Sequence, residues 1–310
     1  MMQQPLRVAT TEVDDRPAIA SGLLSSDIPN CLNFEVETRD IFDRRGKKIP
    51  NRLEVVRKDD ERHLSVVSNT YQLRQFKDFY TEVLDAIWGC NLLDKSDVSA
   101  NHYIDNDGGR YLGSFTFNRN RGIRLFDDNE NERNVFRINM RSSHDMWSAE
   151  VFNFDALYLW CKNGSARREW GIRIMNRHNN KVRKTLEINH IAEAIQAFNE
   201  DQEQMKKFCK IQVELPAVKH LFKKTLVKEP DEKYWNRWKE QWNEYHLGLL
   251  MEIYKQYYDH YGPILFAVYQ TATHWATHID KTRGKVYNVQ DRRMAKVNSM
   301  MNSNYWNELM

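Results

Sequence analysis

Glycine and cysteine are scarce in this chain, and each shortage disfavours particular classes of protein. Its 310 residues include 12 glycines against 9 tryptophans, 14 tyrosines and 14 phenylalanines, which disfavours a fold built on glycine-rich nucleotide loops. The four cysteines are widely scattered and form no CxxC pair, which excludes a zinc ribbon and disfavours a disulfide scaffold. No GxxxxGKS, GxxxxGKT or GxSxG sequence occurs, so no P-loop nucleotide site and no hydrolase nucleophile elbow is expected.

Long apolar runs are missing as well. No stretch approaches the roughly 18 to 20 residues that a membrane span needs. The first twenty residues lack the charged-then-apolar order of a signal peptide. We therefore expect no contact with membranes and a location in the reducing cytoplasm.

The residues that are present predict a folded chain in three regions. Hydrophobic residues make up 41% of the sequence and charged residues 29%, a composition typical of globular domains. Residues 1–30 carry three prolines and few large apolar side chains, which predicts an irregular N-terminal segment. Residues 31–185 are rich in strand patterns, and residues 186–310 are helical by pattern. The fold class expected is α+β, an antiparallel sheet with a packing helix followed by a helical region packed on it.

Period-two alternation of apolar residues dominates the middle region. It predicts roughly six short strands, around residues 32–36, 53–67, 111–117, 135–140, 148–154 and 172–174. Turn sequences at residues 105–109 and 120–122 suggest antiparallel hairpins. Apolar residues at helical spacing predict one amphipathic helix over residues 74–88. Further helices are expected from residue 188, around residue 221, over residues 231–260, from residue 263 to 279 and over residues 286–310.

Positive charge is concentrated in one part of the chain. The whole sequence has a net charge of only +3, but residues 110–184 hold 15 basic and 8 acidic residues. A cationic, strand-rich segment favours a polyanionic partner, most often nucleic acid, and a solvated charged surface is the alternative. The candidate nucleic-acid-binding residues are Arg119, Arg121, Arg124, Arg137, Arg141, Lys162, Arg167, Arg168, Arg173, Arg177, Lys181 and Arg183.

Aromatic residues are interleaved with these cations, among them Tyr111, Phe115, Phe117 and Trp170. Arginine binds phosphate through bidentate hydrogen bonds, and aromatic rings stack on unpaired bases. The mixture predicts a groove that binds single-stranded DNA, although the same arginines also suit salt bridges between protomers. A second aromatic stripe, which includes Trp235, Trp238 and Trp242, is interpreted as core or subunit packing.

Polar motifs that suggest catalysis are weak. A Ser-Ser-His-Asp run occupies residues 142–145, but adjacent residues rarely reach the geometry of a catalytic triad. A hydrogen-bonded turn is the favoured interpretation, with ligand contact and catalysis as alternatives. His274 and His278 lie four residues apart, yet no glutamate follows the first histidine as in zinc proteases. We expect no metal site, no cofactor and no bound nucleotide.

Several short segments, taken in order, resemble one known family. They are SVVSNTYQ at residues 65–72, SSHD at 142–145, LWCKNG at 159–164, RHN at 177–179 and TATHWATH at 271–278. This order is similar to that of the phage and plasmid family known as domain of unknown function 932 (DUF932), over about residues 60–300. Where the family has His-Asp-Gly, this chain has methionine at position 146, which alters any tight turn there. Ser143, His144, Asp145, Asn163 and His178 form a motif to which the resemblance assigns no role.

The resemblance implies a protein of phages, prophages or plasmids that works in a bacterial host cell, and it implies no particular activity. The expected architecture is also similar in outline to that of phage single-strand annealing proteins. We therefore predict a homo-oligomeric protein that binds or anneals single-stranded DNA in replication or recombination, without catalysis. The alternatives are a protein-interaction module, such as a host-takeover or virion-associated factor, and a metal-dependent nuclease built on Asp145, His144 and His178.

Overall fold

The structure contains two antiparallel sheets and a helical C-terminal region, which confirms the predicted α+β fold. The computed structural model describes residues 22–122, 125–126, 134–158, 164–165, 173–178, 184–227, 237–278 and 286–310. At residues 155–158, 164–165, 173, 237–240, 242 and 286–291 it describes the backbone alone.

Apart from α1, which lies between β3 and β4, the strands precede the α-helices along the chain. The strands are β1 (Val36–Phe42), β2 (Lys48–Arg57), β3 (His63–Ser68), β4 (Val98–Asp105), β5 (Arg110–Arg121), β6 (Asn134–Ser143), β7 (Glu150–Tyr158), β8 (Gly164–Ser165) and β9 (Arg173–Asn176). The α-helices are α1 (Phe76–Gly89), α2 (Ile188–Phe208), α3 (Leu215–Thr225), α4 (Arg237–Tyr261), α5 (Leu265–Thr277), α6 (Val286–Met301) and α7 (Asn304–Asn307). Two short 3-10 turns, Asn30–Leu32 and Asn106–Gly108, complete the list.

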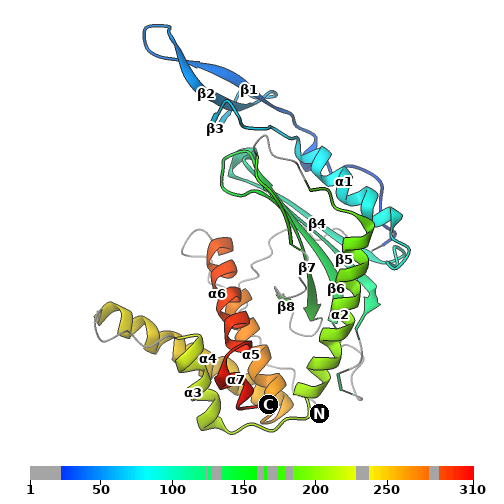
Figure 1. Cartoon of the computed structure of the whole chain (residues 1–310), viewed down its shortest axis with the longest axis vertical. Coiled ribbons are helices and arrows are strands. Elements are labelled where there is room, and N and C mark those ends of the chain that lie inside the picture. Colours follow the sequence, from blue (N-terminus) through cyan, green and yellow to red (C-terminus); the bar gives the residue numbers. More distant parts are fainter. Residues whose placement is uncertain are drawn as a thin grey trace.

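The first three strands form a small sheet that projects from the rest of the molecule (Figure 1). β1 and β2 pair from their base at Arg57 to their outer end at Lys48, whereas β3 pairs only with the inner part of β2. A few buried valines and their apolar neighbours fill the base of this sheet. The outer end of β1 and β2 is therefore a two-stranded ribbon, which we call the ribbon.

The second, larger sheet has the order β4-β5-β6-β7-β8, and β9 also pairs with β7. All of its neighbouring strands are antiparallel. The turn between β4 and β5 uses three consecutive residues with positive φ, namely Asn106 (51°), Asp107 (56°) and Gly108 (102°). Asparagine, aspartate and glycine tolerate this left-handed region best, so the turn predicted at residues 105–109 is confirmed.

Helices α1 and α2 cover one face of the larger sheet (Figure 1). The Phe79 ring of α1 stacks on Phe152 of β7 with centroids 4.7 Å apart, and Phe198 of α2 meets Phe136 of β6 edge-on at 5.8 Å. Alternate residues of each strand point into this aromatic core, as the period-two pattern predicted. The other half of the strand residues points to the opposite face of the sheet.

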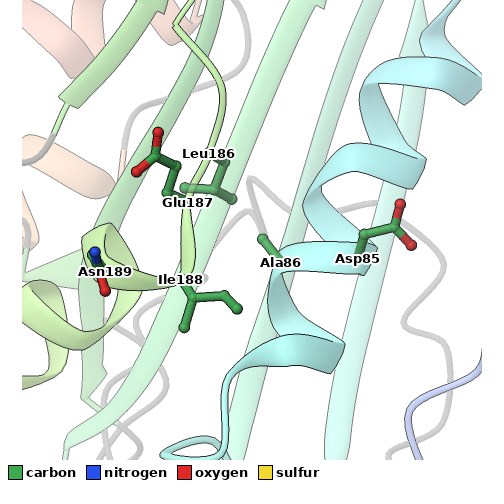
Figure 2. A pocket seen from close by; sticks show the side chains of 6 residues that line it. All are labelled: Asp85, Ala86, Leu186, Glu187, Ile188 and Asn189. Atoms are coloured by element: carbon green, nitrogen blue, oxygen red, sulfur yellow. The ribbon is translucent and has the colours of Figure 1, made fainter.

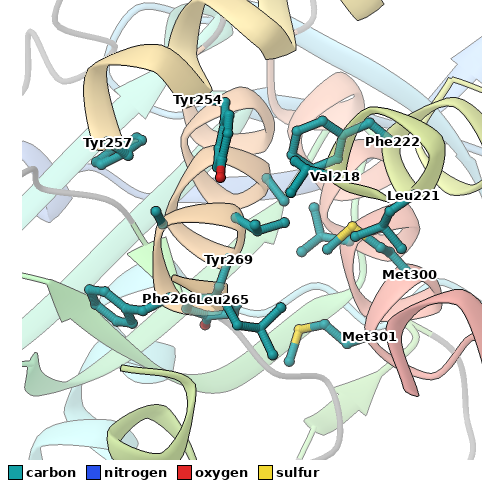
Figure 3. Packing of buried hydrophobic residues seen from close by; sticks show 14 of the residues in the cluster. Val218, Leu221, Phe222, Tyr254, Tyr257, Leu265, Phe266, Tyr269, Met300 and Met301 are labelled. Carbon is teal, nitrogen blue, oxygen red and sulfur yellow. The ribbon is translucent and has the colours of Figure 1, made fainter. Parts of the chain in front are cut away.

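The helical region packs around α5, whose residues are almost all buried. Figure 3 shows side chains of α3, α4 and α6 converging on this helix, with Phe222, Tyr254 and Met300 among them. Among the tyrosines of α4, Tyr254 and Tyr257 are buried, whereas Tyr245 and Tyr258 are exposed. Trp235 lies outside the described residues, and Trp238 and Trp242 are described by their backbone alone.

Helix α2 takes part in both cores. Ile191 and Phe198, in its first half, belong to the core of the larger sheet, whereas Met205 and Phe208 belong to the helical core. One continuous helix therefore connects the two regions. The predicted boundary at residue 185 lies just before this helix and remains a prediction.

Two local expectations were wrong. The alternation at residues 32–36 does not begin a strand, because residues 30–32 form a 3-10 turn and β1 begins only at Val36. Leu32 and Phe34 pack instead against the core that contains α1, and Phe34 meets Phe76 at 6.0 Å. Residues 120–122 do not form a tight hairpin, because β5 continues to Arg121 and the ladder to β6 shifts register after Phe117.

The sequence patterns also missed strand β4. Its inward-facing positions are Val98, Ala100, His102 and Ile104, so a histidine interrupts the apolar alternation. The structure buries this ring at 7% exposure and pairs its Nδ1 with the Tyr111 hydroxyl at 3.0 Å. A hydrogen-bonded histidine thus takes a core position that the pattern assigned to an apolar residue.

Candidate nucleic-acid interface

The face of the larger sheet opposite α1 and α2 is polar. Strand register brings Asn101, Ser114, Asn139 and Asn153 into one row across β4, β5, β6 and β7. Side chains in such a row are cross-strand neighbours about 5 Å apart. We call the row the amide row and this side of the sheet the polar face. Ser114 is buried, whereas the half-buried amides of Asn101, Asn139 and Asn153 offer uncharged hydrogen-bond donors and acceptors.

Arginines lie on both sides of the amide row. Arg137 and Arg141 belong to β6, and their alternation with buried Ile138 and Met140 turns them toward the polar face. Arg141 is directly opposite Leu112 in β5 and Val151 in β7, which are buried beside it. Both arginines are half-buried.

Two further arginines predicted from the sequence occupy the same face by register. Arg121 is opposite Val135, which shares the face of Arg137, and Arg173 is opposite Asn153 in the amide row. Asp155, opposite Arg137, is an acidic residue at a register position on this face. Register therefore places four predicted cations from three strands on one face of the sheet.

An aromatic ring lies at one end of the polar face. Trp147 follows β6, and the guanidinium carbons of Arg110 and Arg141 lie 5.0 and 6.0 Å from its ring centroid. Tyr103 of β4 lies in the same row as Arg141. These rings add π surfaces beside the cations. The rings that the sequence interleaved with the cations were placed wrongly: Tyr111, Phe115 and Phe117 are fully buried in the core on the opposite face, and Trp170 lies outside the described residues.

Register does not place the other predicted cations on the polar face, or they lie outside the described residues. Arg119 is 62% exposed, and its Nε lies 3.9 Å from Asp97. Arg177 follows β9 and is exposed. The positions outside the described residues are Arg124, Lys162, Arg167, Arg168, Lys181 and Arg183.

Residues 142–148 form a closed turn at the end of β6. The Ser143 hydroxyl donates to the Ser148 carbonyl at 3.0 Å and accepts from the Ser148 N–H at 2.8 Å. The backbone of His144 bonds to Gly109 at 2.7 Å and to the Ser65 hydroxyl at 2.6 Å. The turn thus connects β6 to β3 and to the turn between β4 and β5.

The Asp145 carboxylate stabilises this turn through hydrogen bonds. It accepts hydrogen bonds from Asn106 Nδ2 at 2.7 Å, from Arg110 Nε at 2.6 Å and from the Trp147 N–H at 3.0 Å. Both ring nitrogens of His144 lack a hydrogen-bond partner within the described part of the chain. Ser143, His144 and Asp145 therefore do not form a triad, and their geometry is that of a hydrogen-bonded turn.

His144 is completely buried, and its ring stacks on Phe76 at a centroid distance of 3.9 Å. Burial, with a smaller contribution from the charge of His178, lowers the pKa of His144 to about 3. The His178 ring stacks on Tyr71 at 5.0 Å, and burial lowers its pKa as well. Four of the five motif residues are therefore close in space, whereas Asn163 lies outside the described residues.

A buried ion-pair cluster, which sequence patterns did not reveal, lies beside this turn. Arg74 pairs with Glu82 of α1 at 2.9 Å and with Glu150 of β7 at 3.4 Å. Burial raises the pKa of Glu150 to about 7, although the charge of Arg74 opposes the shift. Glu82 also accepts from the N–H of Leu186, just before α2, at 2.9 Å. The cluster joins the two covering helices to the sheet.

His274 and His278 lie in the packing of the helical region. His274 of α5 shares a hydrogen bond of 2.8 Å with the Tyr257 hydroxyl, and its ring lies 4.2 Å from that of His278. Within the residues that the structure describes, no three His, Cys, Asp or Glu side chains gather in a way that would hold a metal ion. None of the described helices combines the length and the apolar composition needed to cross a bilayer.

Comparison with known proteins gives one match. The model of the family described as "Domain of unknown function (DUF932)" matches residues 63–301, which is most of the chain. The chain belongs to the DUF932 family. No curated protein and no solved structure matches it.

The DUF932 match confirms the resemblance found in the sequence and limits what it covers. It begins at His63, the first residue of β3, and therefore includes the polar face and the turn at residues 142–148. Strands β1 and β2 precede the matched range. The ribbon therefore lies outside the matched range.

Met146 takes the place of the glycine expected in DUF932 proteins, and its φ is 59°. A left-handed conformation costs a residue with a Cβ atom about 1 kcal/mol. The side chain is 61% exposed, so its loss removes little packing. Met146→Gly is expected to raise the free energy of unfolding by about 1 kcal/mol in urea titrations.

Met146→Ala is the matched control, because alanine keeps the Cβ atom and therefore the strain. It is expected to leave the free energy of unfolding within about 0.5 kcal/mol of wild type. Equal stabilisation by glycine and alanine would contradict the explanation by backbone strain.

The neutral, buried His144 makes stability depend on pH. Its folded-state pKa lies below the unfolded value of 6.5, so the unfolded chain binds the extra proton and acid favours unfolding. His144→Phe keeps an aromatic ring on Phe76 and removes this titration. Between pH 7 and pH 5, wild type is expected to lose about 2 kcal/mol relative to the variant in chemical denaturation. A difference between the two proteins that does not change with pH would contradict this assignment.

Proposed function

We propose that this protein binds single-stranded DNA along the polar face of the larger sheet. It would act without catalysis, in replication, recombination or strand annealing of a phage or another mobile element, as a homo-oligomer. The observation that carries the proposal is the register that puts Arg121, Arg137, Arg141 and Arg173 on the face of the sheet that bears the amide row.

The chemistry of the polar face suits a single strand. Arginine guanidinium groups bind phosphates through bidentate hydrogen bonds, and the side chains of the amide row can hydrogen-bond to the exposed edges of unpaired bases. Arg137 and Arg141 are four residues apart on β6, or roughly 13 Å, which lets them contact different phosphates of one strand. Trp147 and Tyr103 can stack on bases at the Arg141 end of the polar face.

The alternatives receive less support. A nuclease built on Asp145, His144 and His178 would need side chains that reach a substrate. His144 has no exposed surface, and the Asp145 carboxylate is held by Asn106, Arg110 and the Trp147 N–H. A protein-interaction module remains the competing outcome of the experiment that follows.

Fluorescence anisotropy with labelled oligonucleotides across a salt series tests the proposal. Single-stranded DNA is expected to bind more tightly than duplex of the same length. Four neutralised phosphates predict that log K falls with log salt with a slope of about −3. No binding to any oligonucleotide would overturn the proposal and favour a protein partner, whereas equal affinity for duplex would contradict recognition of unpaired bases.

A further inference from the structure

A shallow groove runs along the first half of α2, where this helix meets α1. One part lies between Asp85 and Ala86 of α1 and the residues around Ile188 at the start of α2 (Figure 2). A second part shares Asn189 and continues along α2 to Glu200, beside Leu92. We call the two parts together the α2 groove.

Apolar side chains in and beside the α2 groove are exposed to solvent. Ile188 is 46% exposed and Leu92 is 56% exposed. Ile188 reaches across to α1, where a Cβ atom on Gly89 would lie 2.7 Å from its Cδ1 atom. Trp88, the neighbour of Gly89, is 42% exposed as well. Exposed apolar groups gathered in this way are typical of binding surfaces.

The charge of the α2 groove has one sign. Every charged side chain among the described residues that line it is acidic, namely Asp85, Glu187, Glu193 and Glu200. These carboxylates repel nucleic acid, which separates the groove from the polar face. A fitting occupant is cationic and carries an apolar side chain.

The tip of the ribbon, residues 42–48, has this complementary chemistry. Phe42 is 57% exposed, and Arg44, Arg45 and Lys47 are exposed beside it without an ion pair to any described residue. The Asp43 carboxylate accepts from the N–H groups of Arg45 and Lys47 at 2.8 and 2.9 Å, which ties it to the turn. The tip therefore presents one aromatic ring and three cations.

We infer that the ribbon tip of one protomer docks in the α2 groove of a second copy of this chain. Figure 1 shows the tip at the far end of the projecting sheet, so it does not reach the groove of its own chain. Phe42 packs against Ile188 and Leu92, while Arg44 and Arg45 pair with the acidic rim. The contact joins two different surfaces, so it repeats from protomer to protomer or closes as a reciprocal pair. It uses no residue of the polar face and does not rest on the proposed function.

Paired charge reversals, with masses measured by light scattering and analytical ultracentrifugation, test this inference. The tip variant carries Arg44→Glu and Arg45→Glu, and the groove variant carries Glu193→Lys and Glu200→Lys. Each is expected to weaken self-association at least about tenfold, because like charges then meet across the contact. Mixing the two variants, or combining all four changes in one chain, restores opposite charges and is expected to restore the wild-type mass.

A matched control reverses two exposed cations at the other end of α2, Lys206→Glu and Lys207→Glu, and is expected to keep the wild-type mass. A wild-type protein that stays monomeric at 100 µM would overturn the inference. Failure of the mixture and of the fourfold variant to reassociate would also overturn it. So would a tip variant that loses DNA affinity at unchanged mass, because the tip would then be a nucleic-acid contact.

Discussion

Replacement of Arg137 and Arg141 together by alanine is expected to weaken the binding of single-stranded DNA by at least about tenfold. The two guanidinium groups belong to the same face of β6 and are the best described cations of the polar face. Loss of two phosphate contacts should also make the salt slope shallower by about 1.4. Fluorescence anisotropy at several salt concentrations measures both effects, and the loss should be similar for all sequences because phosphate contacts carry no base information.

Two controls separate this effect from general loss of charge or fold. Lys206→Ala with Lys207→Ala removes the same charge from the far end of α2 and is expected to leave DNA affinity within twofold of wild type. Arg137→Lys with Arg141→Lys keeps the charge but not the bidentate fork, so an intermediate loss is expected. Equal loss in all three variants, or none in the alanine variant, would place the DNA elsewhere.

Arg74→Ala is expected to have the largest effect on stability, a loss of about 3 kcal/mol in the free energy of unfolding. The Arg74 side chain is 15% exposed, and its removal leaves the carboxylates of Glu82 and Glu150 buried without their cation. The effect should be greatest at pH 8, above the raised pKa of Glu150 of about 7, because a protonated Glu150 would relieve the repulsion. Urea unfolding followed by circular dichroism measures it.

A double-mutant cycle with Glu150→Gln tests the cause of that loss. In the Glu150→Gln background one buried charge is already absent, so Arg74→Ala is expected to cost at least about 1 kcal/mol less than in wild type. Equal costs in both backgrounds would show that Arg74 acts through packing on Phe79, over whose ring it lies, and not through the ion pairs.

Local features of the fold were predictable because their causes are local. Helix α1 follows from apolar residues at helical spacing, and the turn at residues 105–109 follows from the φ preferences of its residues. Strand β4 escaped prediction because the partner of His102 is Tyr111 of the next strand, and a single-strand pattern does not contain that hydrogen bond.

The candidate site was predictable only in part for the same reason. Arg137 and Arg141 are an even number of residues apart on β6, so the sequence alone places them on one face of the strand. The position of Arg121 depends on the register shift after Phe117, and that of Arg173 depends on which strand β9 pairs with. The pairing of Arg74 with Glu150 spans 76 residues and carries no periodic signal. Long-range pairing, more than residue identity, limits what the sequence reveals.

Photo-cross-linking tests the central claim most directly. Single-stranded DNA that carries bromouracil is bound to the full-length protein and irradiated, and the cross-linked peptides are identified by mass spectrometry. The proposed path of the strand predicts adducts on Trp147 or Tyr103, at the Arg141 end of the polar face. Adducts confined to the ribbon tip around Phe42 or to the helical region would contradict binding along the polar face.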